Sequence, residues 1–115
     1  MTDSMQLAQA IAAAASEKKA RDIVILNMIG ISMVTDQFII CSANTKTQVK
    51  AIADNIEEKL AEKGINLLRK EGYREGRWIL LDYDTCVAHV FIEEDRRFYN
   101  LEQLWGDAPK QVYED

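Results

Sequence analysis

Apolar residues recur at helical spacing in two segments of the chain. The first runs from Ser4 to about Ala20, is rich in alanine, and follows Asp3, whose carboxylate can cap free amides at a helix start. The second follows a capping box that begins at Thr45, and Gly64 ends it. Its apolar positions, at i, i+3, i+4 and i+7 spacing, are Val49, Ile52, Ala53, Ile56 and Leu60. We therefore expect two helices, each burying one side.

Shorter apolar or alternating segments predict five strands. They are residues 22–29, 37–42, 66–73, 77–83 and 86–92. The first two are rich in β-branched residues, as in strands buried on both faces, and the last three follow one another through tight connectors as an antiparallel meander. Residues 93–105 indicate one or two helical turns, and residues 107–115 are expected to form a loose C-terminal tail.

This order of elements predicts an α/β (α+β) fold. We expect a single domain over residues 1–115, with a mixed five-stranded sheet and helices packed mainly on one face. Two long helices cannot cover both faces of five strands, so part of one face should be open. Alternation along residues 77–83 places one set of side chains on one face (Trp78, Leu80 and Asp82) and the other set on the opposite face (Ile79, Leu81 and Tyr83). A partner protein could cover the open set.

Composition excludes two classes of protein. Hydrophobic residues make up 48% and charged residues 29% of the 115 residues, which excludes intrinsic disorder. The net charge of −5 excludes a global cationic field that would attract nucleic acid. Residues 61–115 carry twelve acids and eight bases, so a basic protein is the favoured partner and no specific nucleic acid is expected.

Cysteine use and hydropathy indicate a cytoplasmic protein. Cys41 and Cys86 lie in apolar runs, with no C-x-x-C and no paired histidines, and we interpret them as buried residues in a reducing compartment. No apolar stretch approaches the roughly 18 residues of a membrane span. The N-terminus lacks the basic region of a signal peptide, and no membrane association is expected.

Asp82 and Asp84 form the pair most suggestive of catalysis. Carboxylates at i and i+2 after an apolar strand could hold magnesium for phosphoryl transfer, as in a nucleotidyltransferase. The Gly-Ser phosphate-binding turn that such enzymes need is missing, and Asp is also common where a strand ends in a turn. The turn is the favoured interpretation, so we expect no enzyme activity, cofactor or metal.

His89 is the only histidine and lies in the middle of a predicted strand. A hydrogen-bonded structural role is favoured over that of a general base. The sequence places no serine or cysteine nucleophile beside it. Nucleophilic catalysis is therefore not expected.

Residues 69–78 mix four bases with Tyr73 and Trp78. This mixture can hold single-stranded nucleic acid, but Glu71 and Glu75 reduce the local charge. We expect Tyr73 and Trp78 to be cross-strand neighbours in a protein-binding surface. The charge run at residues 93–97 predicts a solvated, self-paired helix start, with a partner contact for Arg96 or Arg97 left open.

The sequence resembles the ribosomal silencing factor S family, also called Iojap-like proteins. The resemblance covers about residues 7–109 and rests on T-D-Q-F-I-I-C-S, G-R-W-I-L-L-D-Y, H-V-F and R-R-F-Y-N-L-E-Q-L-W. It implies a nucleotidyltransferase-like core without the catalytic motif. It also implies a factor that binds large-subunit ribosomal protein fourteen, blocks joining of the small subunit, and represses translation in stationary phase or starvation.

The same resemblance implies a docking surface. Its centre would be Trp78 of the G-R-W segment, joined by Leu80, Asp82 and Tyr83, with Tyr73 and Glu71 as neighbours. The open sheet face also suggests a homodimer when the chain is free. Many relatives read L-D-Y-G-D where this chain has Leu81–Thr85, so the turn glycine is displaced here. Either the turn type or the local contact is expected to differ.

Overall fold

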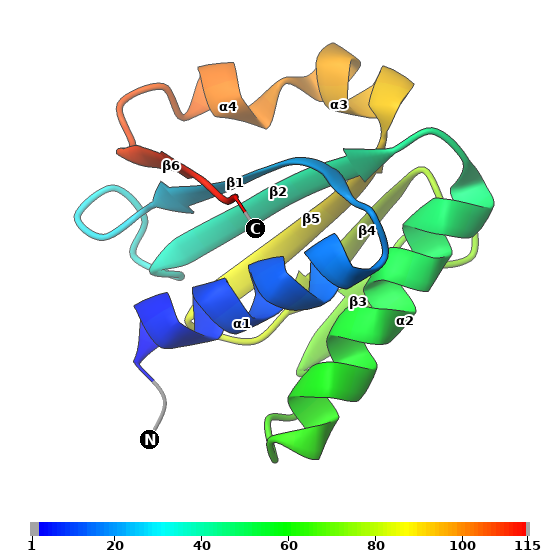
Figure 1. The fold of residues 1–115 in the computed structure, drawn as a ribbon. Coiled ribbons are helices and arrows are strands. Elements are labelled where there is room, and N and C mark those ends of the chain that lie inside the picture. Colours follow the sequence, from blue (N-terminus) through cyan, green and yellow to red (C-terminus); the bar gives the residue numbers. More distant parts are fainter. Residues whose placement is uncertain (1–2, 115) are drawn as a thin grey trace.

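The structure, a computed structural model that describes residues 3–114, consists of a sheet with helices on both faces (Figure 1). Its elements in chain order are α1 (Ser4–Glu17), β1 (Arg21–Asn27), β2 (Gln37–Ala43), α2 (Lys46–Glu62), β3 (Arg69–Glu71), β4 (Trp78–Asp82), β5 (Cys86–Ile92), α3 (Glu93–Tyr99), α4 (Leu101–Leu104) and β6 (Lys110–Val112). None of the helices within residues 3–114 has the length and apolar character to cross a membrane.

The described strands form one mixed sheet in the order β3-β4-β5-β2-β1-β6. All neighbours are antiparallel except β2 and β5, which are parallel. The α+β class and the mixed sheet are therefore confirmed, but the predicted count of five strands is wrong. The sixth strand comes from the predicted loose tail, where Lys110–Val112 pairs with β1. The last predicted tail residue, Asp115, lies outside the described residues.

The two long helices begin at the predicted caps. The Asp3 carboxylate accepts a hydrogen bond from the Met5 amide at 3.2 Å, and the Thr45 hydroxyl accepts one from Gln48 at 3.1 Å. Gly64 follows the end of α2 with a φ of +77°, as a residue after a helix C-cap does. The first helix ends at Glu17, earlier than predicted.

Two apolar clusters lie on opposite sides of the sheet. The larger one fills the space between the sheet and the helices α1 and α2, which cover what we call the first face (Figure 1). The smaller one lies on the second face, over which α3 and α4 pass. Its buried members are Val24, Leu26, Met28, Ile40, Phe91 and Ala108. The long helices thus share one face, as predicted, and the second face has only short helices.

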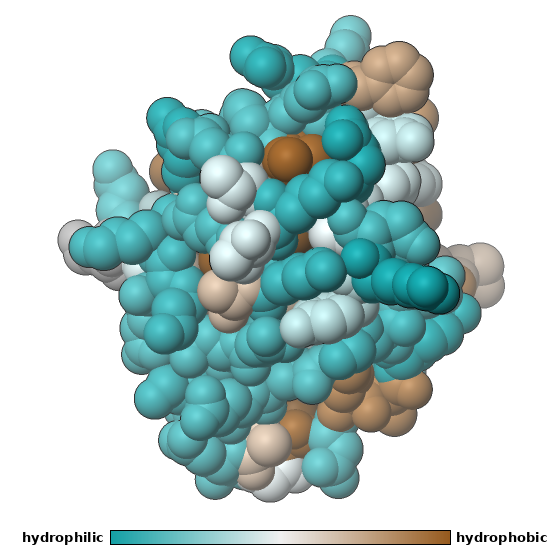
Figure 2. Space-filling model, turned by 90° about the vertical axis from the view of Figure 1, so that its right-hand side faces the viewer, coloured by the Kyte–Doolittle hydropathy of each residue, from teal (hydrophilic) through white to brown (hydrophobic). Residues whose placement is uncertain are grey.

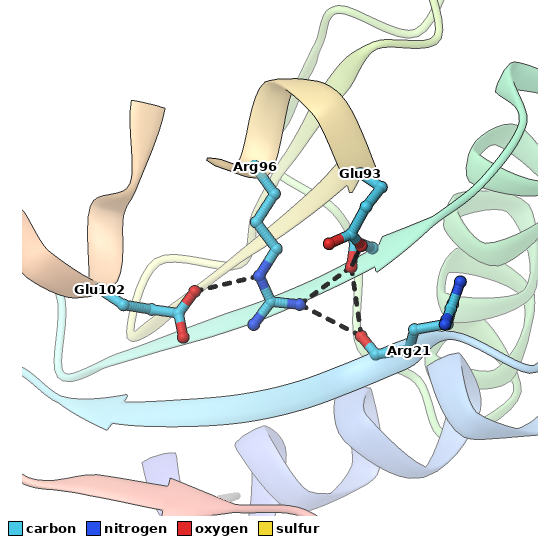
Figure 3. Close-up of polar contacts among 5 residues, drawn as sticks. Arg21, Glu93, Arg96 and Glu102 are labelled. Atoms are coloured by element: carbon cyan, nitrogen blue, oxygen red, sulfur yellow. Dashed lines mark hydrogen bonds and ion pairs between the residues drawn. The ribbon is translucent and has the colours of Figure 1, made fainter. Parts of the chain in front are cut away.

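The charge run at residues 93–97 is not a self-paired helix start. Arg96 is only 8% exposed and points from α3 toward the sheet (Figure 3). Its guanidinium donates to Glu102 at 3.0 Å, to the Ser42 hydroxyl at 3.0 Å and to the Arg21 carbonyl at 3.2 Å. The Ser42 hydroxyl donates to Glu93 at 2.7 Å. This buried network fixes α3 and α4 to β1 and β2, so the predicted solvated start is wrong.

In the turn between β4 and β5, Asp84 has a backbone conformation that is usually adopted by glycine. Asp84 has a φ of +74°, in the left-handed region that glycine favours, and its amide donates to the Asp82 carboxylate at 2.9 Å. Asp84 therefore holds this turn with strained backbone.

Substitution of Asp84 by glycine should raise the free energy of unfolding by about 0.5 kcal/mol, because glycine adopts a positive φ without a Cβ clash. The amide that donates to Asp82 is kept. Asp84→Ala is the matched control and should lower stability, since alanine keeps the Cβ without a polar side chain. Urea unfolding measures both variants, and a change in the same direction for both would contradict the assignment of strain.

Candidate functional site

The side chains of β4 alternate between the two faces of the sheet. Ile79 and Leu81 are buried on the first face, whereas Trp78, Leu80 and Asp82 are half-buried. Trp78 packs against the smaller cluster of the second face. The predicted alternation is confirmed, and it leaves Trp78 and Leu80 accessible.

Two hollows flank these residues. One, of about 250 Å³, is lined by Glu71, Gly72, Trp78 and Leu80. The other, of about 190 Å³, is lined by Ser32, Val34, Thr35, Phe38, Arg69, Leu80, Asp82, Val87 and His89. Leu80 lines both, so the hollows adjoin. We call the residues Glu71, Trp78, Leu80, Asp82, Phe38 and Val87 the Trp78 surface.

The register of the sheet explains why these side chains meet. Glu71 of β3 lies opposite Leu80, and Asp82 lies opposite Val87 of β5. Val87 in turn lies opposite Phe38 of β2. Four strands thus contribute side chains to the Trp78 surface, and the predicted residues Trp78, Leu80, Asp82 and Glu71 are brought together.

Close approach of the backbone requires glycine beside this surface. Gly72 follows β3 with a φ of +78°, and a Cβ built there would lie 2.0 Å from the Trp78 carbonyl oxygen. A larger residue would push the β3 end away from β4. Gly72 therefore keeps the wall of the larger hollow in place.

Trp78 itself is held by aromatic neighbours and one hydrogen bond. Its indole Nε1 donates to Nδ1 of His89 at 3.1 Å, and ring centroids of Phe91 and Tyr99 each lie 4.8 Å from it. Burial lowers the pKa of His89 to about 4, so the imidazole is neutral at physiological pH. The predicted hydrogen-bonded structural role of His89 is confirmed.

Apolar residues that the sequence analysis missed extend the accessible region. Val34, in the loop between β1 and β2, is 84% exposed and lines the smaller hollow, and Met33 beside it is fully exposed. On the other side, Phe98 of α3 is 80% exposed and contacts Tyr99. The signal that the sequence offered for this extension is the pair of adjacent aromatics in the R-R-F-Y segment.

Tyr83 and Tyr73 do not belong to the Trp78 surface. Tyr83 is buried on the first face, as its alternation with Trp78 requires, so the structure does not bring it together with Trp78, and its predicted part in docking stays a prediction. Tyr73 packs against the core of that same face, and its hydroxyl donates to Asp54 of α2 at 3.0 Å. The turn after β3 carries Tyr73 toward α2, so it is not the predicted neighbour of Trp78.

The Asp82 and Asp84 pair forms a turn. One carboxylate oxygen of Asp82 accepts a hydrogen bond from the Asp84 amide, and the other lies 3.8 Å from the Arg69 guanidinium. Both oxygens of Asp82 thus have a partner within the protein. Within residues 3–114, no group of three or more His, Cys, Asp or Glu side chains is placed to hold a metal ion. Burial raises the pKa of the Cys41 and Cys86 thiols to about 12, so neither is a thiolate nucleophile at neutral pH.

The bases of residues 69–78 are largely paired with acids. Arg69 lies 3.0 Å from Glu71, Lys70 lies 2.7 Å from Glu57 of α2, and the Arg77 guanidinium donates to Asp95. Hydrophilic residues dominate the side of the molecule at the right of Figure 1, with apolar residues only in small separate areas (Figure 2). Paired charges of this kind favour a protein contact over RNA binding.

Comparison with protein families decides the relationship. The model of the family described as "Ribosomal silencing factor during starvation" matches residues 1–115. The chain belongs to the ribosomal silencing factor family. The resemblance found in the sequence is thereby confirmed, and membership of this family indicates a role in translation regulation. The chain is 46% identical over 106 residues to the "Ribosomal silencing factor RsfS" of Halalkalibacterium halodurans, covering 92% of this chain and 91% of that protein.

Other relatives span bacteria and plants. The Bacillus subtilis "Ribosomal silencing factor RsfS" is 50% identical over 98 residues, covering 85% of this chain and 83% of that protein. The Zea mays "Protein Iojap, chloroplastic" is 34% identical over 106 residues, which are 92% of this chain and 46% of that longer protein. A Bacillus halodurans crystal structure matches with a TM-score of 0.83 and 43% identity, covering 93% of this chain and 97% of that one. The family fold is therefore shared.

Proposed function

We propose that the chain represses translation by docking on the large ribosomal subunit through the Trp78 surface. The partner would be large-subunit protein fourteen, and the bound chain would block joining of the small subunit. The observation that carries this proposal is a half-buried tryptophan that lines one of two adjoining hollows on the sheet face that lacks long helices, in a member of the ribosomal silencing factor family. Tryptophan is the residue most enriched at binding hot spots.

Charge supports a basic protein as the partner. The chain has a net charge of −5, and at the Trp78 surface the two carboxylates of Glu71 and Asp82 outnumber the one guanidinium, that of Arg69, that lies near both. Acidic side chains around an apolar centre favour encounter with a basic protein and set its orientation. To block subunit joining, the chain then needs only to stay bound to the large subunit, because it excludes the small subunit from the space that it fills.

The proposed activity is binding without catalysis, and it uses no cofactor. The turn around Asp82 and Asp84 gives both residues a structural role, and no observation favours the alternative of a nucleotidyltransferase with magnesium. The site of action would be the cytoplasm, where ribosomes translate. A second copy of the chain is a further occupant of the Trp78 surface, so homodimerisation would compete with docking.

A subunit-joining assay tests the proposal. Purified chain is added to large subunits before small subunits, and sucrose-gradient sedimentation measures the fraction of joined ribosomes. That fraction should fall as the chain saturates the large subunit, and cross-linking should identify protein fourteen as the attached partner. Unchanged joining at saturation would contradict the proposed block, and attachment to another ribosomal protein would contradict the proposed site.

A further inference from the structure

Trp78 has one polar atom, and the fold already uses it. The indole Nε1–H can only donate, and it donates to His89 Nδ1 at 3.1 Å. His89 comes from the neighbouring strand β5, where it lies opposite Leu80 in register. A partner that contacts Trp78 therefore meets the carbon atoms of the indole and not its hydrogen-bond donor.

The hydrogen bond and the ring contacts together define one orientation of the indole. The Phe91 ring stacks on it, and the Tyr99 ring packs at the same centroid distance of 4.8 Å. His89 is itself held in place, because the Phe38 ring packs edge-on against it at 4.6 Å. Because Trp78 is only half-buried, these neighbours are what restricts rotation about its side-chain torsions.

Packing alone does not explain an imidazole at this position. His89 is 4% exposed, and its Nε2 has no hydrogen-bond partner among residues 3–114. Because Nδ1 accepts from Trp78, the proton of the neutral ring is on Nε2, which leaves a buried donor unsatisfied. A buried polar atom without a partner lowers stability, and phenylalanine would fill the same space without that loss. The benefit of the imidazole is the hydrogen bond to Trp78.

We propose that His89 is a positioning residue of the docking surface, which fixes the Trp78 indole in the orientation that the ribosomal partner binds. The inference rests on the proposed function, because it assigns His89 a part in that same contact. A side chain ordered before binding loses less conformational entropy on association. The complementary feature of the partner is then an apolar recess for the indole, with no acceptor aimed at its nitrogen.

Two substitutions separate positioning from packing. His89→Phe keeps the ring volume but removes the acceptor, so the indole can turn toward water. His89→Asn loses ring contacts with Phe38 and Phe91, but its amide oxygen can accept at the place of Nδ1. We expect His89→Phe to weaken binding to purified large subunits about tenfold, and His89→Asn to bind within about threefold of the unchanged chain despite a lower melting temperature.

The indole N–H resonance of Trp78 reports on its hydrogen bond, and its exchange is compared at a temperature where every variant is fully folded, because global unfolding also exposes this proton. In ¹⁵N NMR of the free chain, assigned with Trp78→Phe, that proton should exchange slowly in the unchanged chain and in His89→Asn. It should exchange fast in His89→Phe. The inference would be overturned if the affinities of the two variants for large subunits followed their melting temperatures. It would also be overturned if His89→Phe kept both the affinity and the slow exchange of the unchanged chain.

The same binding assay distinguishes the two levels of the proposal. If Trp78→Ala abolishes binding while folded His89→Phe binds as the unchanged chain does, only the positioning role is wrong. If Trp78→Ala also binds normally, the docking surface is wrong, and the positioning role for docking falls with it.

Discussion

Replacement of Trp78 by alanine should weaken binding to the large ribosomal subunit about a hundredfold while leaving the chain folded. Removal of a hot-spot tryptophan commonly costs 2 kcal/mol or more of binding free energy, and about 1.4 kcal/mol corresponds to a factor of ten. The indole is half-buried and belongs to the smaller cluster, so the larger core between α1, α2 and the sheet stays intact. Co-sedimentation with large subunits at increasing protein concentration measures the loss.

Two further variants make this result specific. Val112→Ala removes exposed apolar atoms at the opposite edge of the sheet and should bind normally. Leu80→Lys places an ammonium group between the two hollows without disturbing the aromatic contacts of Trp78, and it should also lose binding. Circular dichroism confirms folding of each variant. Normal binding by folded Trp78→Ala and Leu80→Lys would contradict the docking surface.

Replacement of Arg96 by alanine should lower the free energy of unfolding by about 3 kcal/mol. The side chain is almost fully buried and donates three hydrogen bonds, one of them to the Glu102 carboxylate. Removal of one partner from a buried charged network leaves the other groups without compensation, and such losses are typically 3–5 kcal/mol. Glu102 is partly accessible to water, which places the expected value at the lower end.

Arg97 provides the matched control. It is the next residue in α3, carries the same charge, and is exposed, so Arg97→Ala should change stability by about 0.5 kcal/mol or less. Arg96→Lys should fall between the two, because an ammonium keeps the charge but cannot reproduce the planar arrangement of donors. Urea unfolding curves compare the three. Equal losses for Arg96→Ala and Arg97→Ala would show that the network contributes nothing.

Local sequence signals predicted the elements that depend on near neighbours. The capping position of Thr45 and the glycine after α2 were both readable because a helix end is satisfied within a few residues. The two-residue alternation of β4 placed Trp78 and Ile79 on opposite faces, since side chains of any strand alternate. The centre of the candidate surface was therefore predictable.

Features that depend on distant contacts were not predictable in this way. Arg96 contacts Ser42, which is 54 residues away, and no local pattern distinguishes it from the exposed Arg97. The turn that follows β3 directs Tyr73 toward α2. A regular hairpin extended from the sequence would instead pair Tyr73 with Trp78, which is why the prediction differed. Residues Lys110–Val112 become a strand only because β1 offers them an edge.

That last pairing has a consequence for the fate of the chain at high concentration. Residues 23–26 of β1 are buried on both sides of the sheet, so an unpaired β1 would present free backbone amides and carbonyls within an apolar strand. Such an edge recruits strands of other molecules and begins aggregation. The short strand β6, with a lysine at its start, occupies this edge. By pairing with β1, strand β6 thus protects this edge of the sheet from strand pairing between molecules.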